Sequence, residues 1–137
     1  MIEESERFLP ERATADVERK RVLVVDDDLP LRGMLSSVLR RHGFQVYLAG
    51  DGDEAQRALI LHKPHVVLLD LMMPGVNGWD FLQRLNDTGF AGQIPVIVVS
   101  AHLRKDPQAI LQMGVKAILP KPFNIDDLLE VIRSVVP

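Results

Sequence analysis

Several classes of protein are excluded by what this chain lacks. It has no cysteine, and this rules out a disulfide framework, a thiolate metal site and a cysteine nucleophile. No charge-free apolar stretch approaches the roughly 18 residues that a membrane-spanning helix needs, and the acidic N-terminus has no apolar signal segment. There is also no basic surplus: the formal net charge is −3, which argues against a nucleic-acid-binding surface. We therefore expect a soluble, cytoplasmic protein with no membrane insertion and no direct nucleic-acid contact.

The length and charge pattern indicate one folded domain preceded by an extension. A chain of 137 residues with 47% hydrophobic residues suits a single domain. Residues 1–20 carry six acids and four bases, which leaves a net charge of −1 for residues 21–137. We expect 1–20 to be a flexible N-terminal extension and 21–137 to be the domain. The alternative is a docking segment anchored by Phe8 and Leu9.

From Arg21 onward, short apolar runs alternate with amphipathic segments. We expect strands at about 21–26 and 44–48, then one ending at Asp70, one ending at Val99 and one leading to Lys121. Apolar spacing predicts helices at about 31–42, 53–62, 81–85, 104–113 and 125–136, the last with Asn124 as its N-cap. Such alternation is typical of an α/β fold with a five-stranded parallel sheet and helices on both faces.

Chemically useful side chains follow four of these strands. The triplet Asp26-Asp27-Asp28 follows the first strand, Asp70 the third, Ser100 the fourth and Lys121 the fifth. Because parallel strands bring their carboxyl ends to one edge of the sheet, we expect these groups to form one site.

The composition of that site favours phosphate chemistry with a divalent metal. Asp26, Asp27 and Asp70 would repel one another, and Lys121 supplies only one positive charge. Carboxylate, carbonyl and water ligands suit Mg²⁺, whereas no histidine cluster points to zinc. Asp70 is then a candidate nucleophile that forms an aspartyl phosphate, with Lys121 offsetting charge and the Ser100 hydroxyl donating to a phosphoryl oxygen.

These segments resemble the response-regulator receiver domain of two-component signalling, in its single-domain, chemotaxis-receiver-like form. The matching motifs are Val24–Asp28, Leu69–Gly75 with Gly78, Val98–Ala101 and Lys121–Phe123, and they occur in the family's order and spacing over 21–136. The resemblance implies the flavodoxin-like receiver fold, with strand order 2-1-3-4-5.

The resemblance also implies a role for each site residue. Asp70 would be the phospho-acceptor, and Asp27, Asp70 and the Met72 carbonyl would bind Mg²⁺, with Asp26 holding a metal-bound water. Ser100 would be the switch hydroxyl and Lys121 the phosphate-contacting lysine. From their position in the chain, Met72 and Met73 are expected to pack the loop, and Met72, two residues after Asp70, is also a candidate to shield the acyl phosphate from water.

The implied function is a signalling switch and not a turnover enzyme, since the domain catalyses only its own phosphorylation and dephosphorylation. Its partners would be a sensor histidine kinase or phosphotransfer protein and a downstream protein target, while the sequence leaves open whether the chain also forms a homodimer on activation. The signal would pass through the face made by the fourth helix, fifth strand and last helix. The chain would be a stand-alone receiver or a fragment of a longer protein.

One departure and three alternatives accompany this interpretation. Ile118 stands where many receivers have Tyr or Phe, so the usual aromatic readout is missing. A degenerate, binding-only receiver would keep the acidic site without using it. An Asp-nucleophile Mg²⁺ phosphatase usually has a second acid two residues after the nucleophile, where this chain has Met72. A flavodoxin-like cofactor carrier would need a hydroxyl-rich loop after the first strand, where the three aspartates stand.

Overall fold

Five parallel strands and five helices alternate along the chain. The structure is a computed structural model, and it describes residues 19–73, 78–88, 94–101 and 107–136. The strands are β1 (Arg21–Val25), β2 (Gln45–Ala49), β3 (Val66–Leu69), β4 (Val96–Ser100) and β5 (Ala117–Pro120). The helices are α2 (Leu29–Arg41), α3 (Gly52–His62), α4 (Gly78–Thr88), α5 (Pro107–Leu111) and α6 (Ile125–Val135). The prediction of a flexible extension over 1–20 falls almost entirely outside the described residues.

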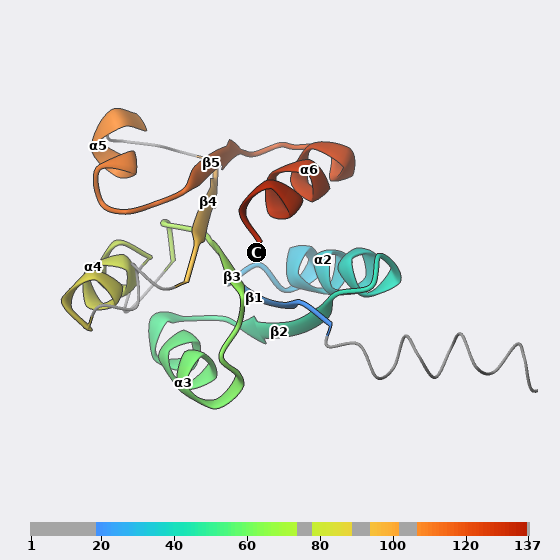
Figure 1. The fold of residues 1–137 in the computed structure, drawn as a ribbon, viewed down its shortest axis with the longest axis horizontal. Helices are drawn as coiled ribbons and strands as arrows, with labels where there is room; N and C mark the ends of the chain where they lie inside the picture. Colours follow the sequence, from blue (N-terminus) through green and yellow to red (C-terminus); the bar gives the residue numbers. More distant parts are fainter. Residues whose placement is uncertain (1–18, 74–77, 89–93, 102–106, 137) are drawn as a thin grey trace, which may run out of the picture.

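The strands form one parallel sheet in the order β2-β1-β3-β4-β5, which confirms the predicted topology (Figure 1). Strands β1, β3 and β4 are central, and their side chains are buried on both faces of the sheet. This two-sided burial explains why those runs are almost continuously apolar in the sequence.

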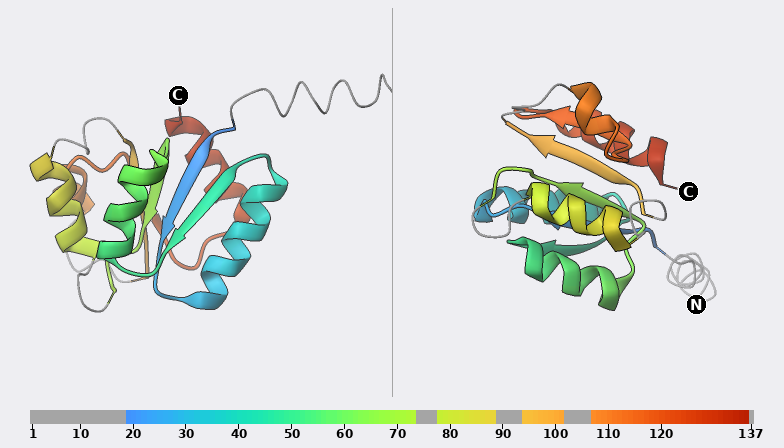
Figure 2. Two further views of the ribbon diagram at one scale, coloured as in Figure 1. Left: turned by 90° about the horizontal axis from the view of Figure 1, so that it is seen from below. Right: turned by 90° about the vertical axis from the view of Figure 1, so that its left-hand side faces the viewer.

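Helices cover both faces of the sheet, and each face has its own apolar core (Figures 1 and 2). On one face α2 and α6 pack against the strands through residues such as Leu35, Leu39 and Leu128. On the other face α3, α4 and α5 contribute residues such as Leu59, Phe81 and Ile110. The sheet is thus the middle of three layers, and only its two rims remain for a polar site.

Local signals set the ends of the helices. Asp28 is the N-cap of α2 and accepts a hydrogen bond from the Leu31 N–H at 3.1 Å. Asn124 caps α6 by accepting from the Asp127 N–H at 2.7 Å, which confirms the predicted cap. Gly43, with φ of 92°, lies just beyond the carboxyl end of α2, where the chain needs a positive φ.

Several element boundaries differ from the prediction, among them the end of β4, which lies at Ser100 and not at Val99. The helix expected at 104–113 ends at Leu111, because the chain turns there toward Gly114, which has φ of 89°. Its expected start lies partly in 102–106, outside the described residues. Strands β1 and β3 end at Val25 and Leu69, one residue earlier than expected, so Asp26 and Asp70 are the first residues beyond their strands. Among the helices of the described residues, none is both long and apolar enough to span a membrane.

Candidate functional site

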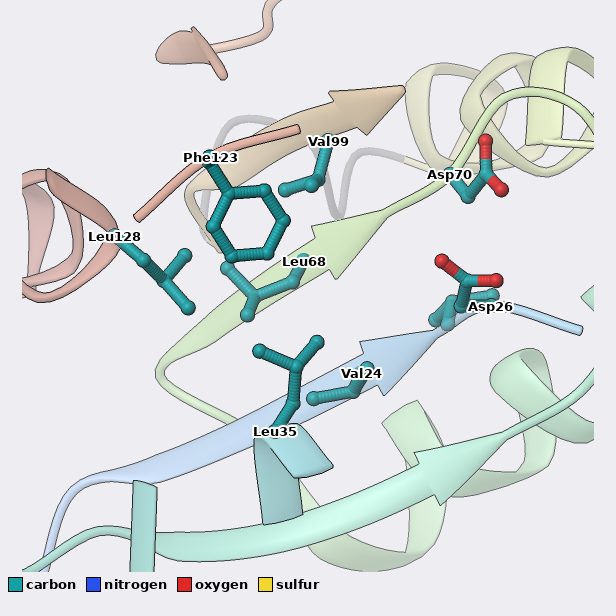
Figure 3. Close-up of a pocket in the computed structure, with 9 residues that line it drawn as sticks. Val24, Asp26, Leu35, Leu68, Asp70, Val99, Phe123 and Leu128 are labelled. Atoms are coloured by element: carbon teal, nitrogen blue, oxygen red, sulfur yellow. The ribbon is translucent and has the colours of Figure 1, made fainter. Parts of the chain in front are cut away.

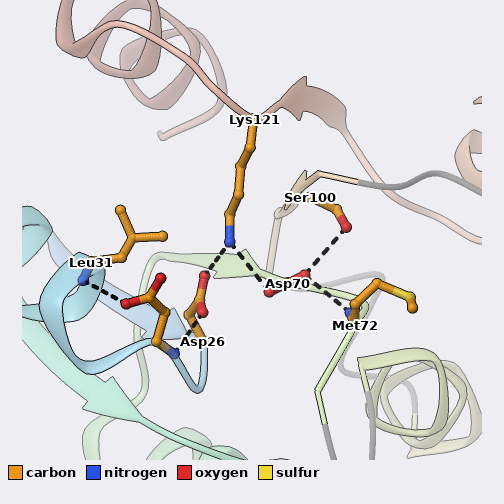
Figure 4. A network of polar contacts seen from close by, with 7 residues as sticks. Asp26, Leu31, Asp70, Met72, Ser100 and Lys121 are labelled. Atoms are coloured by element: carbon orange, nitrogen blue, oxygen red, sulfur yellow. Dashed lines mark hydrogen bonds and ion pairs between the residues drawn. The ribbon is translucent and has the colours of Figure 1, made fainter.

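The register of the sheet brings the predicted site residues to one rim. Val25 pairs with Leu69, so the next residues, Asp26 and Asp70, lie on neighbouring strand ends. The Asp70 N–H donates to the Val25 carbonyl at 2.9 Å and continues the ladder one step further. On the other side, the Lys121 N–H donates to the Ser100 carbonyl at 3.0 Å. Backbone pairing therefore delivers two acids, a hydroxyl and an ammonium to one place (Figure 4).

Asp26 is a buried carboxylate with a partner on each oxygen. Asp26 is only 4% exposed. The Asp28 N–H donates to Oδ1 at 2.9 Å, and the Lys121 ammonium donates to Oδ2 at 2.7 Å. These two bonds hold the carboxylate in one orientation and offset part of the cost of burying its charge.

Asp70 is buried and is also held on both oxygens. It is 7% exposed. Oδ1 accepts from the Ser100 hydroxyl at 3.2 Å and from the Met72 N–H at 3.0 Å, while Oδ2 accepts from the Lys121 ammonium at 3.3 Å (Figure 4). A carboxylate with this many donors is oriented before any reaction begins.

Lys121 bridges the two buried acids from the end of β5. Burial by itself would lower the pKa of Lys121, but the hydrogen bond to Asp26 and the charges of Asp26 and Asp70 outweigh burial and raise that pKa above its ordinary value. The lysine therefore stays protonated through the neutral range. The peptide bond between Lys121 and Pro122 is cis, a feature that the sequence did not decide.

Asp27 completes a group of three carboxylates. One ligand atom from each of Asp26, Asp27 and Asp70 lies within 4.8 Å of the others. Asp27 is exposed, and none of the residues in the described ranges makes a hydrogen bond to its side chain. Clustered oxygen donors with one solvent-facing acid fit a hard divalent cation, which keeps several waters when bound.

An apolar pocket underlies the carboxylates on the α2 and α6 side of the sheet. Figure 3 shows Asp26 and Asp70 at one end of it and the ring of Phe123 beside Leu68 and Val99. Leu35 and Leu128 complete this side of the pocket. The apolar lining offers few groups that could hydrogen-bond water beneath the acids, and a low-dielectric floor strengthens the charge interactions above it.

The structure thus brings together every side chain that the sequence placed in the site: Asp26, Asp27, Asp70, Ser100 and Lys121. Met72 also lies beside Asp70, through its N–H. Asp28, interpreted from the sequence as a solvated turn residue, is instead the cap of α2. The Asp-x-x spacing ahead of the helix was the available signal.

Two further residues have positions that bear on the site. Ile118 is half-buried and packs against the core on the α3, α4 and α5 side, opposite Val98 of β4. Phe123 lines the pocket from the loop after Pro122. Sequence reasoning gave no role to Phe123, because its position depends on how the loop before α6 folds back.

Comparison with known proteins identifies the class. The model of the response regulator receiver domain family matches residues 22–133. The chain is 39% identical over 121 residues to the DNA-binding response regulator MtrA of Mycobacterium tuberculosis. The aligned segment covers 87% of this chain and 51% of MtrA. MtrA of Mycolicibacterium smegmatis gives the same identity and coverage. The chain thus spans about half the length of these curated relatives.

Solved structures agree with this fold. The chemotaxis protein CheY4 of Vibrio cholerae superposes with a TM-score of 0.78 at 27% identity, covering 87% of this chain and 100% of that one. The response regulator TrrA of Thermotoga maritima, solved in complex with Mg²⁺ and BeF, gives a TM-score of 0.74 at 27% identity, covering 85% and 99%. The doubly wound sheet and the acidic rim define a receiver, and this chain belongs to the response regulator receiver domain family.

Proposed function

We propose that this chain is a phosphorylation-dependent signalling switch in which Asp70 accepts a phosphoryl group with the help of Mg²⁺. The observation that carries the proposal is the environment of Asp70. Its carboxylate is held by Lys121, Ser100 and the Met72 N–H, and it stands beside two further carboxylates. We take residues 21–137 as the receiver domain, in the cytoplasm.

The donor class is a phosphohistidine on a sensor histidine kinase or phosphotransfer protein. One oxygen of Asp70 forms a bond to phosphorus while the phosphorus–nitrogen bond of the donor breaks, and the leaving imidazole takes a proton from water. The bond from Met72 fixes one oxygen of the acceptor, and Lys121 lies beside the other. Lys121 and Ser100 then donate to the phosphoryl oxygens, where negative charge accumulates.

The metal would be held by Asp27, Asp70 and the Met72 carbonyl, with Asp26 reaching it through a water. When bound, Mg²⁺ supplies positive charge against the phosphoryl oxygens and the crowded acids. The oxygen-only donor set and the exposure of Asp27 support this assignment. The TrrA structure with Mg²⁺ and BeF lends support by analogy within the family.

The output is a change in protein contacts. A phosphoryl group on Asp70 adds negative charge near Lys121 and Ser100 at the ends of β5 and β4. Their response shifts the face formed by α5, β5 and α6 and alters the affinity for a downstream protein or a second copy of the chain. Ile118 lies on this route in place of an aromatic residue, so the readout is a repacking of aliphatic side chains.

Intact-mass measurement tests the proposal against its alternatives. The chain is incubated with acetyl phosphate or phosphoramidate and Mg²⁺. We expect a labile phosphate adduct that is lost with EDTA and with Asp70→Asn. An unchanged mass at saturating donor would favour a binding-only receiver. Continuous release of inorganic phosphate from varied phosphomonoesters would favour a phosphatase.

A further inference from the structure

Gly78 is a motif residue to which the proposed site gives no role. It is the first residue of α4 and is buried. A methyl group added at Gly78 would overlap the carbonyl oxygen of Asp70 and the Cα of Leu71, and would lie 2.9 Å from the Asp70 carbonyl carbon. The start of α4 therefore lies directly against the backbone of the proposed phospho-acceptor.

The atoms in this contact belong to the backbone, so no side-chain rotation can relieve an overlap. Only glycine permits such a close approach between two chain segments. Gly33, within α2, is a useful contrast because a methyl group there would meet nothing within 4 Å. The two glycines thus separate the general effect of adding a methyl group to a helix from the effect of contact with Asp70.

Leu71 lies directly before Met72, so a displacement of the backbone at Leu71 would also move a residue of the site. The next residue, Met72, donates its N–H to Asp70 Oδ1 at 3.0 Å and is the proposed source of a carbonyl ligand. The helix has little freedom to move away instead, because Arg84 on α4 bonds to two residues of α3, Asp53 at 3.2 Å and Gln56 at 3.0 Å. The side chains of α4 at Phe81 and Leu82 are also fully enclosed in the core.

We propose that Gly78 is a positioning residue: its missing side chain lets α4 abut the backbone of Asp70 and Leu71 and so fixes the acceptor carboxylate and the Met72 peptide group for metal binding and phosphorylation. The inference rests on the proposed function. Small displacements of reacting groups cost roughly a hundredfold in rate per ångström. A residue that contacts neither the metal nor the phosphate can therefore affect both the Mg²⁺ affinity and the rate of phosphorylation.

The chain carries its own reporter for this contact. Trp79, the only tryptophan of the sequence, follows Gly78 and packs against the core. If α4 abuts the acceptor backbone, Mg²⁺ binding at the acids changes the surroundings of Trp79. In the parent protein we expect its fluorescence to follow Mg²⁺ binding measured by calorimetry. Constant fluorescence during measured binding would overturn the proposal, and this test needs no variant.

The variant test compares Gly78→Ala with Gly33→Ala, using Mg²⁺ calorimetry and the rate of adduct formation against acetyl phosphate concentration. We expect Gly78→Ala to weaken Mg²⁺ binding and lower the maximal rate by roughly tenfold or more, and Gly33→Ala to leave both within about twofold. Parent-like binding and rate in folded Gly78→Ala would contradict the inference. A parent protein that binds no Mg²⁺ and forms no adduct would instead contradict the proposed function.

A double variant separates positioning from stability. Arg84→Ala removes the bonds to α3, which are one of the two restraints on α4, and so eases an outward shift of the start of α4 in the presence of Ala at position 78. Positioning predicts that Gly78→Ala/Arg84→Ala partly regains Mg²⁺ affinity while its free energy of unfolding falls further. A purely structural role predicts that both quantities fall together, and that result would overturn the proposal.

Discussion

Lys121 and Asp26, 95 positions apart in the chain, form an ion pair in which Nζ lies 2.7 Å from Oδ2. The same ammonium lies 3.3 Å from Asp70 Oδ2. The lysine is thus closer to Asp26 than to Asp70, the proposed acceptor, and it neutralises only part of the charge of three clustered carboxylates. The remaining negative charge should therefore lower the stability of the metal-free protein. The same charge should favour the binding of a cation.

Asp27→Asn tests both expectations. Asp27 adds a negative charge to the cluster, and no residue of the described segments bonds to its side chain. Without Mg²⁺, we expect the variant to raise the free energy of unfolding, by at most about 1 kcal/mol because the charge is exposed. Stabilisation by added Mg²⁺, visible in the parent, should largely disappear.

Urea denaturation with EDTA and with Mg²⁺ measures both effects. Glu130→Gln is the matched control, because Glu130 is an exposed acid on α6. A parent protein whose stability does not respond to Mg²⁺ would contradict the metal assignment.

Alkaline pH tests the ion pairs of Lys121. Its pKa is higher in the folded protein than the ordinary value of 10.5, so the folded state holds this proton more tightly than the unfolded state does. The corresponding stabilisation is complete below the unfolded pKa and is lost as pH rises through the folded pKa. With EDTA present, we expect the parent protein to lose stability above about pH 10 more steeply than Lys121→Met does. Lys116→Met changes an exposed lysine just before β5 and should lose stability with pH as steeply as the parent does. If all three proteins lost stability equally steeply, the ion pairs of Lys121 would not contribute as proposed.

Ser100 tests how the signal leaves the site. Its hydroxyl is fully buried and bonded to Asp70, so Ser100→Ala should lower the free energy of unfolding by about 1 kcal/mol. In the parent protein, phosphorylation should shift the NMR methyl signals of Ile118, which packs beside β4. We expect those shifts to shrink in Ser100→Ala and to persist in Ser100→Thr, which keeps the hydroxyl. Shifts of unchanged size in Ser100→Ala would exclude this hydroxyl from the route.

Met72 tests the protection of the acyl phosphate. Met72 is 39% exposed and its N–H donates to Asp70 Oδ1, so we expect its side chain to limit the approach of water to the phosphorylated carboxylate. We expect Met72→Ala to shorten the lifetime of the phosphorylated state several-fold, as measured by loss of the adduct over time. Leu111→Ala is the control, because Leu111 is 38% exposed and lies on α5. A lifetime equal to that of the parent would show that the methionine does not shield the bond.

The sequence predicted much of this site because its signals are local. Each acid, the hydroxyl and the lysine directly follow an apolar run, and parallel strands necessarily bring such ends together. The strand order followed from the resemblance, and it is confirmed by the pairing of β1 with β2 and β3.

Other features depend on contacts that no local pattern encodes. The approach of Gly78 to the Asp70 backbone and the position of Phe123 in the pocket arise from packing between distant segments. The interpretation of Asp28 was wrong for a different reason. Its bond to the Leu31 N–H is local, but in a run of three aspartates the sequence does not show which one caps the helix.

Chemical mapping of the phosphorylated residue tests the central claim most directly. The chain is phosphorylated with Mg²⁺ and a small donor, treated with sodium borohydride to reduce the acyl phosphate to an alcohol, and digested for peptide mass analysis. The account predicts homoserine at position 70 and at no other carboxylate, with none in a sample kept in EDTA. Homoserine at Asp26 or Asp27, or a phosphate adduct that survives borohydride without any homoserine, would contradict it.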